Sequence, residues 1–259
     1  MYPLRYLPSG YIFIHPDDDC DGVVDAMLET GYSEEFCLAR DFEEGFIGRL
    51  MEAGFLVMSA ELKDDEESDD SGPDGEANSG GAEPAGTEPF FILLPKLHLI
   101  RSALFFPELH IKKSIRPFLG RYELRVNADF DYILDRCVQI HGADWLTPPL
   151  TDILKRLHRI SSLHPGHLRA RPVSFGVYRD GKLRAGEIGV VMGRVYTSYS
   201  GYYEEDNAGT VQIILMAQWL DQAGFDFLDL GMPLDYKTQL GARDITPHRF
   251  VKLFRQARF

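Results

Sequence analysis

The chain has 259 residues, 44% of them hydrophobic, and a formal net charge of −13. A chain of this length can bury a sizeable core as one large or two small domains. It has no run of about 18 apolar residues that would predict a membrane-spanning helix, and its start lacks the features of a signal peptide. We therefore expect a soluble, cytoplasmic protein, and we expect it to be a monomer.

Most of the negative charge lies in one segment, residues 61–88, which holds eleven Asp or Glu residues and one Lys. This segment has almost no large apolar side chains, so burial cannot offset the entropy lost on ordering it. We predict a disordered acidic insertion, either as a plain linker or as an autoinhibitory mimic of a polyanion. It would separate an N-terminal lobe, residues 1–60, from a larger domain, residues 89–259.

The lobe and the start of the larger domain show several element signals. Apolar runs and capping residues predict a strand at 10–14, helices at 19–30 and 41–53, strand material at 90–106, and helices at 129–141 and 147–160. The three cysteines, Cys20, Cys37 and Cys137, have no C-x-x-C spacing, which indicates core thiols rather than a disulfide framework or a metal site.

The second half of the chain predicts an antiparallel meander followed by a strand–helix–strand crossover. The expected elements are strands 172–179, 183–192 and 194–200, a helix at 208–223, and a strand at 225–230. A crossover of this kind favours a last strand parallel to its partner. We therefore expect an α/β fold with a mixed sheet, of the α+β type, whose element order resembles that of the GNAT acyltransferase core.

The last of these strands contains an aspartate among apolar residues. The period-2 rule places Asp229 on one face with Phe225 and Phe227. A carboxylate in such a position must be hydrogen-bonded, paired or used. Asp229 is thus a candidate catalytic residue, and the alternative is that it accepts hydrogen bonds at the Gly-Met-Pro bend that follows.

Basic residues gather in two runs outside the acidic segment, at 109–125 and 155–179. Such local excesses can attract a phosphate backbone even on an acidic protein, although a solvated basic face is the alternative. Four residues are the first candidates for nucleic-acid contacts: Lys112, Lys113, Arg156 and Arg159.

Several stretches together resemble the leucyl/phenylalanyl-tRNA-protein transferases. The matching runs are "LHIKKS" at 109–114, "DWLTPPLTDILKRLH" at 144–158, "DGKLRAGEIGVVMGRVY" at 180–196, "DNA" at 206–208, "LDLG" at 228–231 and "QLGARDI" at 239–245. They follow the family's order from about 104 to 250. The resemblance implies an aminoacyltransferase of the leucyltransferase type, which moves leucine or phenylalanine from charged tRNA to a protein N-terminus and marks that protein for degradation under the N-end rule.

The resemblance also assigns roles to residues. It makes Asp229 the catalytic aspartate, Trp145 the pocket tryptophan and Asn207 the start of the helix after the meander. This chain has Gly231 where the family has a glutamine and Tyr199 where it has a glutamate.

The expected chemistry is direct aminolysis of an activated ester, which needs no cofactor, no metal and no nucleophilic side chain. Asp229, with its pKa raised between Phe225 and Phe227, would accept the proton of the attacking amine. Three tyrosines of "TSYSGYYEE", Tyr199, Tyr202 and Tyr203, would supply hydroxyls or a stacking surface for the terminal adenine of the tRNA.

Three alternatives to this function stay open at the level of sequence. The tyrosine-rich "YSGYYEE" is also similar to arginyl-type transferases, which would change the donor or acceptor. A CoA-dependent acyltransferase is disfavoured, because "YYEEDNAGT" puts acids where backbone amides would cradle a pyrophosphate. A catalytically inactive module that binds tRNA or an N-terminal degron is the third.

Overall fold

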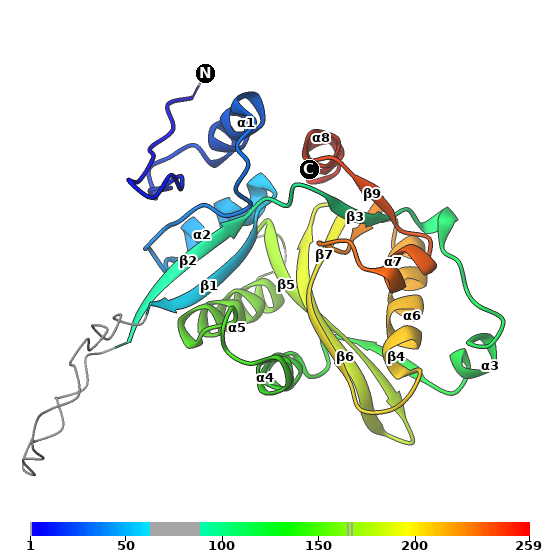
Figure 1. Ribbon diagram of the computed structural model, residues 1–259. Coiled ribbons are helices and arrows are strands. Elements are labelled where there is room, and N and C mark those ends of the chain that lie inside the picture. The colour runs from blue at the N-terminus through cyan, green and yellow to red at the C-terminus, as the bar shows by residue number, and fades with distance from the viewer. Residues whose placement is uncertain (1, 63–88, 165, 167) are drawn as a thin grey trace, which may run out of the picture.

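The computed structural model describes residues 2–62, 89–164, 166 and 168–259. They form a two-stranded sheet near the N-terminus and a seven-stranded mixed sheet with helices on both faces (Figure 1). The expected α/β class with a mixed sheet is confirmed, whereas the narrower GNAT assignment stays a prediction. No helix within these described ranges is long and apolar enough to cross a membrane.

The N-terminal part holds helices α1 (Cys20–Thr30) and α2 (Glu44–Ala53) and strands β1 (Leu56–Leu62) and β2 (Phe90–Lys96). Asp19 caps α1 by accepting from the Asp21 amide, and Gly54 ends α2 in the left-handed conformation that glycine adopts without strain. The expected strand at 10–14 is wrong, because residues there make only isolated bridges, such as Phe13 with Leu38.

Strands β1 and β2 pair antiparallel from Leu56↔Lys96 to Leu62↔Phe90. The predicted acidic insertion therefore connects two paired strands, and apart from Glu61 and Leu62 it lies outside the described residues. Strand β2 follows that insertion in sequence but pairs with the strand that precedes it. The division into a lobe at 1–60 and a domain at 89–259 stays a prediction.

The large sheet has the order β4-β5-β6-β7-β8-β3-β9. Its meander is confirmed, and the crossover strand β8 pairs parallel to β7, as expected. The bounds of its strands are β3 Arg101–Leu104, β4 Glu123–Val126, β5 Ala170–Arg179, β6 Lys182–Met192, β7 Val195–Tyr203, β8 Phe227–Asp229 and β9 Arg243–Ile245.

Helices cover both faces of this sheet (Figure 1). Helices α4 (Phe130–His141) and α5 (Pro148–Leu163) bury Ile133, Leu134 and Leu154 in the cluster that includes Ile188 of β6. Helix α6 (Ala208–Gln222) packs on the other face, where Met216 joins Phe175 of β5. The remaining helices are the one-turn η1 (Phe106–Glu108), α3 (Arg116–Leu119), α7 (Asp235–Gln239) and α8 (Pro247–Ala257). All three cysteines are buried and free, as expected.

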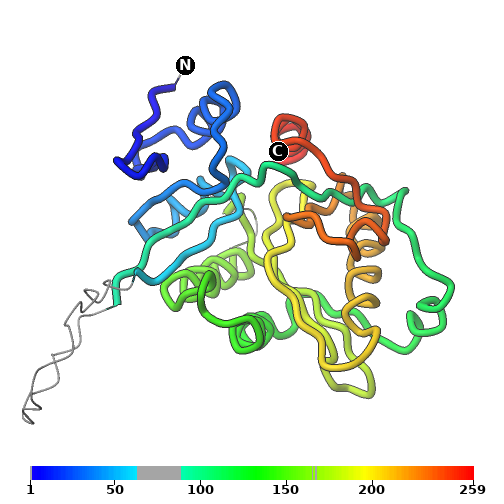
Figure 2. Tube along the Cα trace, viewed as in Figure 1, coloured from blue at the N-terminus to red at the C-terminus, as the bar shows by residue number. Residues whose placement is uncertain are grey.

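The C-terminal helix α8 returns to the N-terminal elements (Figure 2). Arg258, just after α8, bonds both carboxylate oxygens of Asp21, at 2.8 and 2.6 Å, and Arg255 bonds Asp25 at 2.6 Å. Phe250 and Phe254 of α8 join the same buried cluster as α1 and α2. These contacts hold the small sheet against the large one, and residues of both sheets line one cavity.

Candidate functional site

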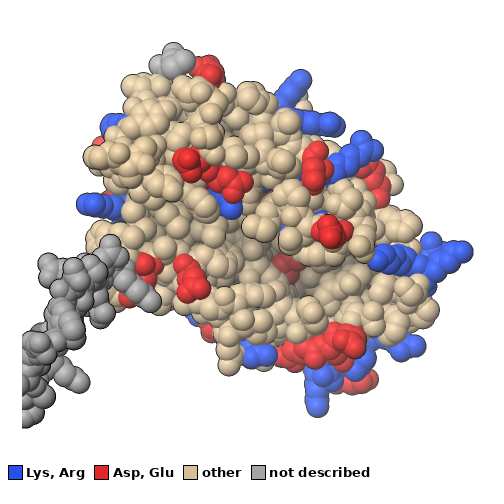
Figure 3. Space-filling view, viewed as in Figure 1, with Lys and Arg blue, Asp and Glu red and all other residues tan. Residues whose placement is uncertain are grey.

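The large sheet opens between β7 and β8. The two strands pair only from Val195↔Phe227 to Thr197↔Asp229, whereas β7 continues along β6 to Tyr203. Beyond Asp229 the chain turns away at Gly231, whose φ is 69°. A cavity of about 780 Å³ occupies this opening, between the free part of β7, the start of α6, and the loop that leads from β8 into α7. The hollow faces the viewer in Figure 3.

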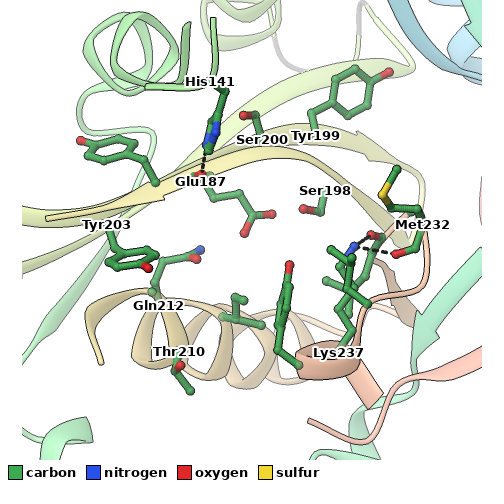
Figure 4. Close-up of a pocket in the computed structure, with 18 of the residues that line it drawn as sticks. His141, Glu187, Ser198, Tyr199, Ser200, Tyr203, Thr210, Gln212, Met232 and Lys237 are labelled. Carbon is green, nitrogen blue, oxygen red and sulfur yellow. Dashed lines mark hydrogen bonds between the residues drawn. The ribbon is translucent and has the colours of Figure 1, made fainter. Parts of the chain in front are cut away.

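A glutamate stands in the interior of this cavity. Glu187, in the middle of β6, is 4% exposed and points toward Gln212 and Ser198 (Figure 4). Tyr196 donates its hydroxyl to Glu187 Oε1 at 3.2 Å. Burial raises the pKa of Glu187 to about 6, and hydrogen bonds from Ser198 and Gln212 limit the rise. Among the ion pairs of the described chain, none within 4.0 Å involves this carboxylate.

A buried lysine holds the loop on the opposite wall. Lys237 Nζ donates to the carbonyl oxygens of Leu230 at 2.5 Å and of Met232 at 2.7 Å (Figure 4). An ammonium group has three donors, so one N–H of Lys237 is left for the cavity. Burial lowers the pKa of Lys237 from its ordinary value.

The small sheet supplies a further wall of the cavity, with Lys96 and His98 at the end of β2. Lys96 is paired with Glu35 at 2.9 Å, and it stacks over the Phe36 ring. Burial and the nearby cations lower the pKa of His98 to about 4, so its imidazole is neutral at pH 7.

Asp229 does not line the cavity. Its side chain is fully buried, and it accepts four hydrogen bonds: from Arg101 Nε at 2.9 Å, Arg101 Nη2 at 2.7 Å, Thr197 Oγ1 at 2.9 Å and the Gly231 amide at 3.0 Å. A carboxylate has about four lone-pair sites. They are all used, so Asp229 holds the strand end and the turn in this structure, and its assignment as the catalytic residue stays a prediction.

The phenylalanines expected beside Asp229 also lie away from the cavity. Strand β8 begins only at Phe227, which packs against Phe105 with ring centroids 5.8 Å apart. Phe225 precedes the strand and packs against Trp219 of α6, on the other face of the sheet. The period-2 rule failed at Phe225 because it was applied before the strand starts. Both rings pack in the core, and their expected substrate-binding role stays a prediction.

The structure does bring the other predicted substrate-binding residues together. Trp145, Asn207 and the three tyrosines all line the cavity. A β-bulge in β7, between Ser198 and Ser200, sets Tyr199 apart, and its hydroxyl accepts from the Val57 amide at 3.2 Å. Tyr203 is 65% exposed, whereas Tyr202 is buried.

The four basic candidates lie on two different parts of the surface. Lys112 and Lys113 are exposed just before α3, which lies at the right of Figure 1. Arg156 and Arg159 are on α5, where they pair with Glu44 at 2.6 Å and with Asp131 at 2.8 Å. Lys112 Nζ donates to the neutral side chain of Gln239, at 2.5 Å.

Sequence reasoning missed Glu187, Gln212 and Lys237. Glu187 stands in the run "RAGEIGVV", a charged residue within a buried strand, which is the signal that singled out Asp229. Applied evenly, that signal would have found both carboxylates. It would not have told them apart, because Arg101, the partner of Asp229, is 128 residues away along the chain.

The comparisons with known proteins match this region of the chain. A family model described as leucyl/phenylalanyl-tRNA protein transferase matches residues 103–255. A protein of that name from Pseudomonas putida (strain W619) is 32% identical over 156 residues, which are 58% of this chain and 65% of that protein. Its namesake from Maridesulfovibrio salexigens is 26% identical over 164 residues, which are 61% and 65% of the two chains. The chain thus spans just under two thirds of the length of these relatives.

The chain belongs to the leucyl/phenylalanyl-tRNA protein transferase family, since the family model covers more than half of it. Among solved structures, L-PGS from Bacillus licheniformis covers 99% of this chain and 89% of its own, at 11% identity and a TM-score of 0.40. The matched residues 103–255 include Glu187, Lys237 and the whole free part of β7.

Proposed function

We propose that the protein transfers an aminoacyl group from charged tRNA to the N-terminal amine of an acceptor protein. The observation that carries this proposal is the position of the cavity, which lies largely within the region that the family model matches. The family's name gives leucine and phenylalanine as donors. In a cell the acceptor would be marked for degradation in the cytoplasm.

The reaction is an aminolysis of the ester that joins the amino acid to tRNA. The amine nitrogen attacks the ester carbonyl, the new C–N bond forms, the C–O bond breaks, and the amine proton ends on the released tRNA hydroxyl. An N-terminal amine has a pKa of about 7.7 to 8.0, so a useful fraction is neutral near pH 7.5. The chain must therefore mainly orient the two substrates and stabilise the tetrahedral oxyanion.

We assign oxyanion stabilisation to Lys237. Its two bonds to the Leu230 and Met232 carbonyls fix the ammonium in place and leave one N–H for the ester oxygen. A donor that is fixed before the reaction stabilises developing negative charge most effectively. Asp229 supports this arrangement without lining the cavity, because it accepts a hydrogen bond from the Gly231 amide and so holds the same loop.

The tRNA end would enter past the exposed rim of the cavity. Tyr203 offers an exposed ring on which the terminal adenine could stack. Asp206, which also lines the cavity, stands beside the start of α6. A pyrophosphate there would meet its carboxylate, which disfavours CoA as the donor.

The basic surface gives a prediction about tRNA affinity. Lys112→Ala with Lys113→Ala should weaken binding and flatten the slope of log affinity against log salt by roughly two units or less, since each true phosphate contact contributes about one. Filter binding at several salt concentrations measures both quantities. The matched control is Arg156→Ala with Arg159→Ala, which removes the same charge from side chains already paired with Glu44 and Asp131. If the control flattens the slope and the lysine variant does not, the tRNA lies over α5 instead.

The function itself is tested by transfer from a panel of radiolabelled aminoacyl-tRNAs to peptides with different N-terminal residues. We expect label on the peptide with at least one donor, and loss of that label when the peptide's N-terminus is acetylated. Label that depends on acetyl-CoA rather than on aminoacyl-tRNA would replace the proposal with an acyl-CoA transferase. Binding of tRNA without any transfer would leave an inactive binding module.

A further inference from the structure

Glu187 is a carboxylate that no cation of the described residues pairs with, although it stands in the interior of an open cavity. Its neighbours are neutral donors: the Tyr196 hydroxyl at 3.2 Å and the side chains of Ser198 and Gln212. The charge of Lys237 acts favourably on Glu187 across the cavity, but two of its N–H groups are held by backbone carbonyls and it makes no ion pair with the carboxylate. A buried carboxylate without a direct ion-pair partner is unfavourable, and such a site gains most when a ligand supplies the opposite charge in contact with it.

The walls that lead to Glu187 are apolar and aromatic. Ile213 of α6, Leu230 and the ring of Tyr236 line the same cavity. Exposure rises from 4% at Glu187 to 65% at Tyr203, so the carboxylate lies at the inner end and Tyr203 lies toward the mouth. This arrangement suits a side chain with an aliphatic stem and a cationic tip, which buries its stem along apolar surface.

We propose that Glu187 binds the cationic side chain of the donor aminoacyl group, so that arginyl-tRNA or lysyl-tRNA, rather than leucyl-tRNA or phenylalanyl-tRNA, is the donor. This inference rests on the proposed transferase function. The tRNA must stay outside the cavity, and its ester carbonyl must reach Lys237, on the wall opposite Glu187. The side chain is then the part of the donor that is free to reach the inner end.

The same geometry disfavours the other candidates for this position. An α-ammonium group is one carbon from the ester carbonyl and would stay with it on the wall that holds Lys237. The side chain of leucine or phenylalanine would cover Glu187 with hydrocarbon and give it no partner, which is unfavourable for a carboxylate. A guanidinium group, in contrast, offers several N–H donors to the two carboxylate oxygens.

The test compares transfer of arginine, lysine, leucine and phenylalanine from their tRNAs by the full chain, at equal tRNA concentrations. We expect wild-type kcat/KM to be highest with arginyl- or lysyl-tRNA. Glu187→Gln should lower that value by at least roughly 30-fold, the effect of removing one partner of a buried charge pair, and should leave the apolar donors unchanged or improved. Glu187→Met should favour leucyl-tRNA. The matched control is Glu123→Gln, which replaces an exposed glutamate of β4 that pairs with Arg125; it should not change transfer from any donor.

Two results would overturn the inference and leave the transferase function in place. One is a wild-type protein that uses leucyl- or phenylalanyl-tRNA and neither cationic donor. The other is an equal loss with every donor in Glu187→Gln, which would place the carboxylate at the α-ammonium or at the acceptor amine.

A binding measurement separates this inference from the proposed function. Isothermal titration with arginine methyl ester and leucine methyl ester should show tighter binding of the arginine ester by the wild type, and no preference in Glu187→Gln. If no donor supports transfer but the arginine ester is still preferred, the transferase proposal fails while the cation site stands. If the two esters bind equally to the wild type, the cation site is disproved whatever the transfer assay shows.

Discussion

Asp229→Ala should lower the free energy of unfolding by about 3–5 kcal/mol, the usual effect of removing one partner of a buried ion pair. Arg101 is 1% exposed and would be left without its counter-charge, beside the Gly54 carbonyl and the Phe250 ring. The Gly231 amide and the Thr197 hydroxyl would lose their acceptor as well. Urea denaturation followed by circular dichroism measures the change.

The matched control for this variant is a substitution at Asp226, three residues before Asp229. Asp226 makes a bidentate pair with Arg194 at 2.9 Å for both bonds, but the two side chains are 41% and 53% exposed. Asp226→Ala should therefore change stability by about 1 kcal/mol or less. If Asp229→Ala keeps full stability and loses transfer, the aspartate takes part in the reaction and the structural assignment made here is wrong.

Glu187→Gln should raise the free energy of unfolding by roughly 2 kcal/mol at pH 8. The pKa of this buried carboxyl rises from its ordinary value of 4.5 to about 6, and each pKa unit corresponds to about 1.4 kcal/mol. The amide keeps the shape and can accept the Tyr196 hydroxyl but carries no charge to bury. A buried carboxylate that lowers the stability of the ligand-free protein is expected at a site where a bound ligand supplies the positive charge.

The pH dependence of this effect has a definite sign. Between pH 4.5 and 6 the folded state holds the Glu187 proton more tightly than the unfolded state, so wild-type stability falls as pH rises through this window. Above pH 6 the destabilisation of the wild type by the charged Glu187 is constant, and below about pH 4.5 this destabilisation is close to zero. The difference between wild type and Glu187→Gln should therefore be near zero at pH 4.5 and full at pH 8. A difference that is independent of pH would show that the carboxylate is not the cause.

Much of the fold can be predicted from the sequence, because its signals are local. The Asp180-Gly181 pair adopts positive φ at both residues and joins β5 to β6, as that dipeptide predicts. Helix α6 ends near the expected Gly224, and the order of helix and strand predicted the parallel pairing of β7 and β8. The residues at 10–14 were mistaken for a strand because their apolar side chains fill the core without continuous backbone pairing.

The site was harder to predict because it depends on contacts between distant segments. The same feature, an acid in a buried strand, marks both Asp229 and Glu187, and only the position of Arg101 decides which one is neutralised within the protein. The contribution of the small sheet, through His98 and Lys96, depends on how β1 and β2 dock on the large sheet. No local pattern contains that information.

The central claim is that the cavity beside β7 holds the aminoacyl end of a charged tRNA with its side chain on Glu187. The most direct measurement is a crystal structure of the protein with a non-hydrolysable analogue, 3′-arginylamino-3′-deoxyadenosine. The account predicts the guanidinium within hydrogen-bonding distance of the Glu187 carboxylate, the amide carbonyl facing Lys237, and the adenine near Tyr203. An analogue bound outside this cavity, or bound in it with the arginine side chain directed to solvent, would contradict the account.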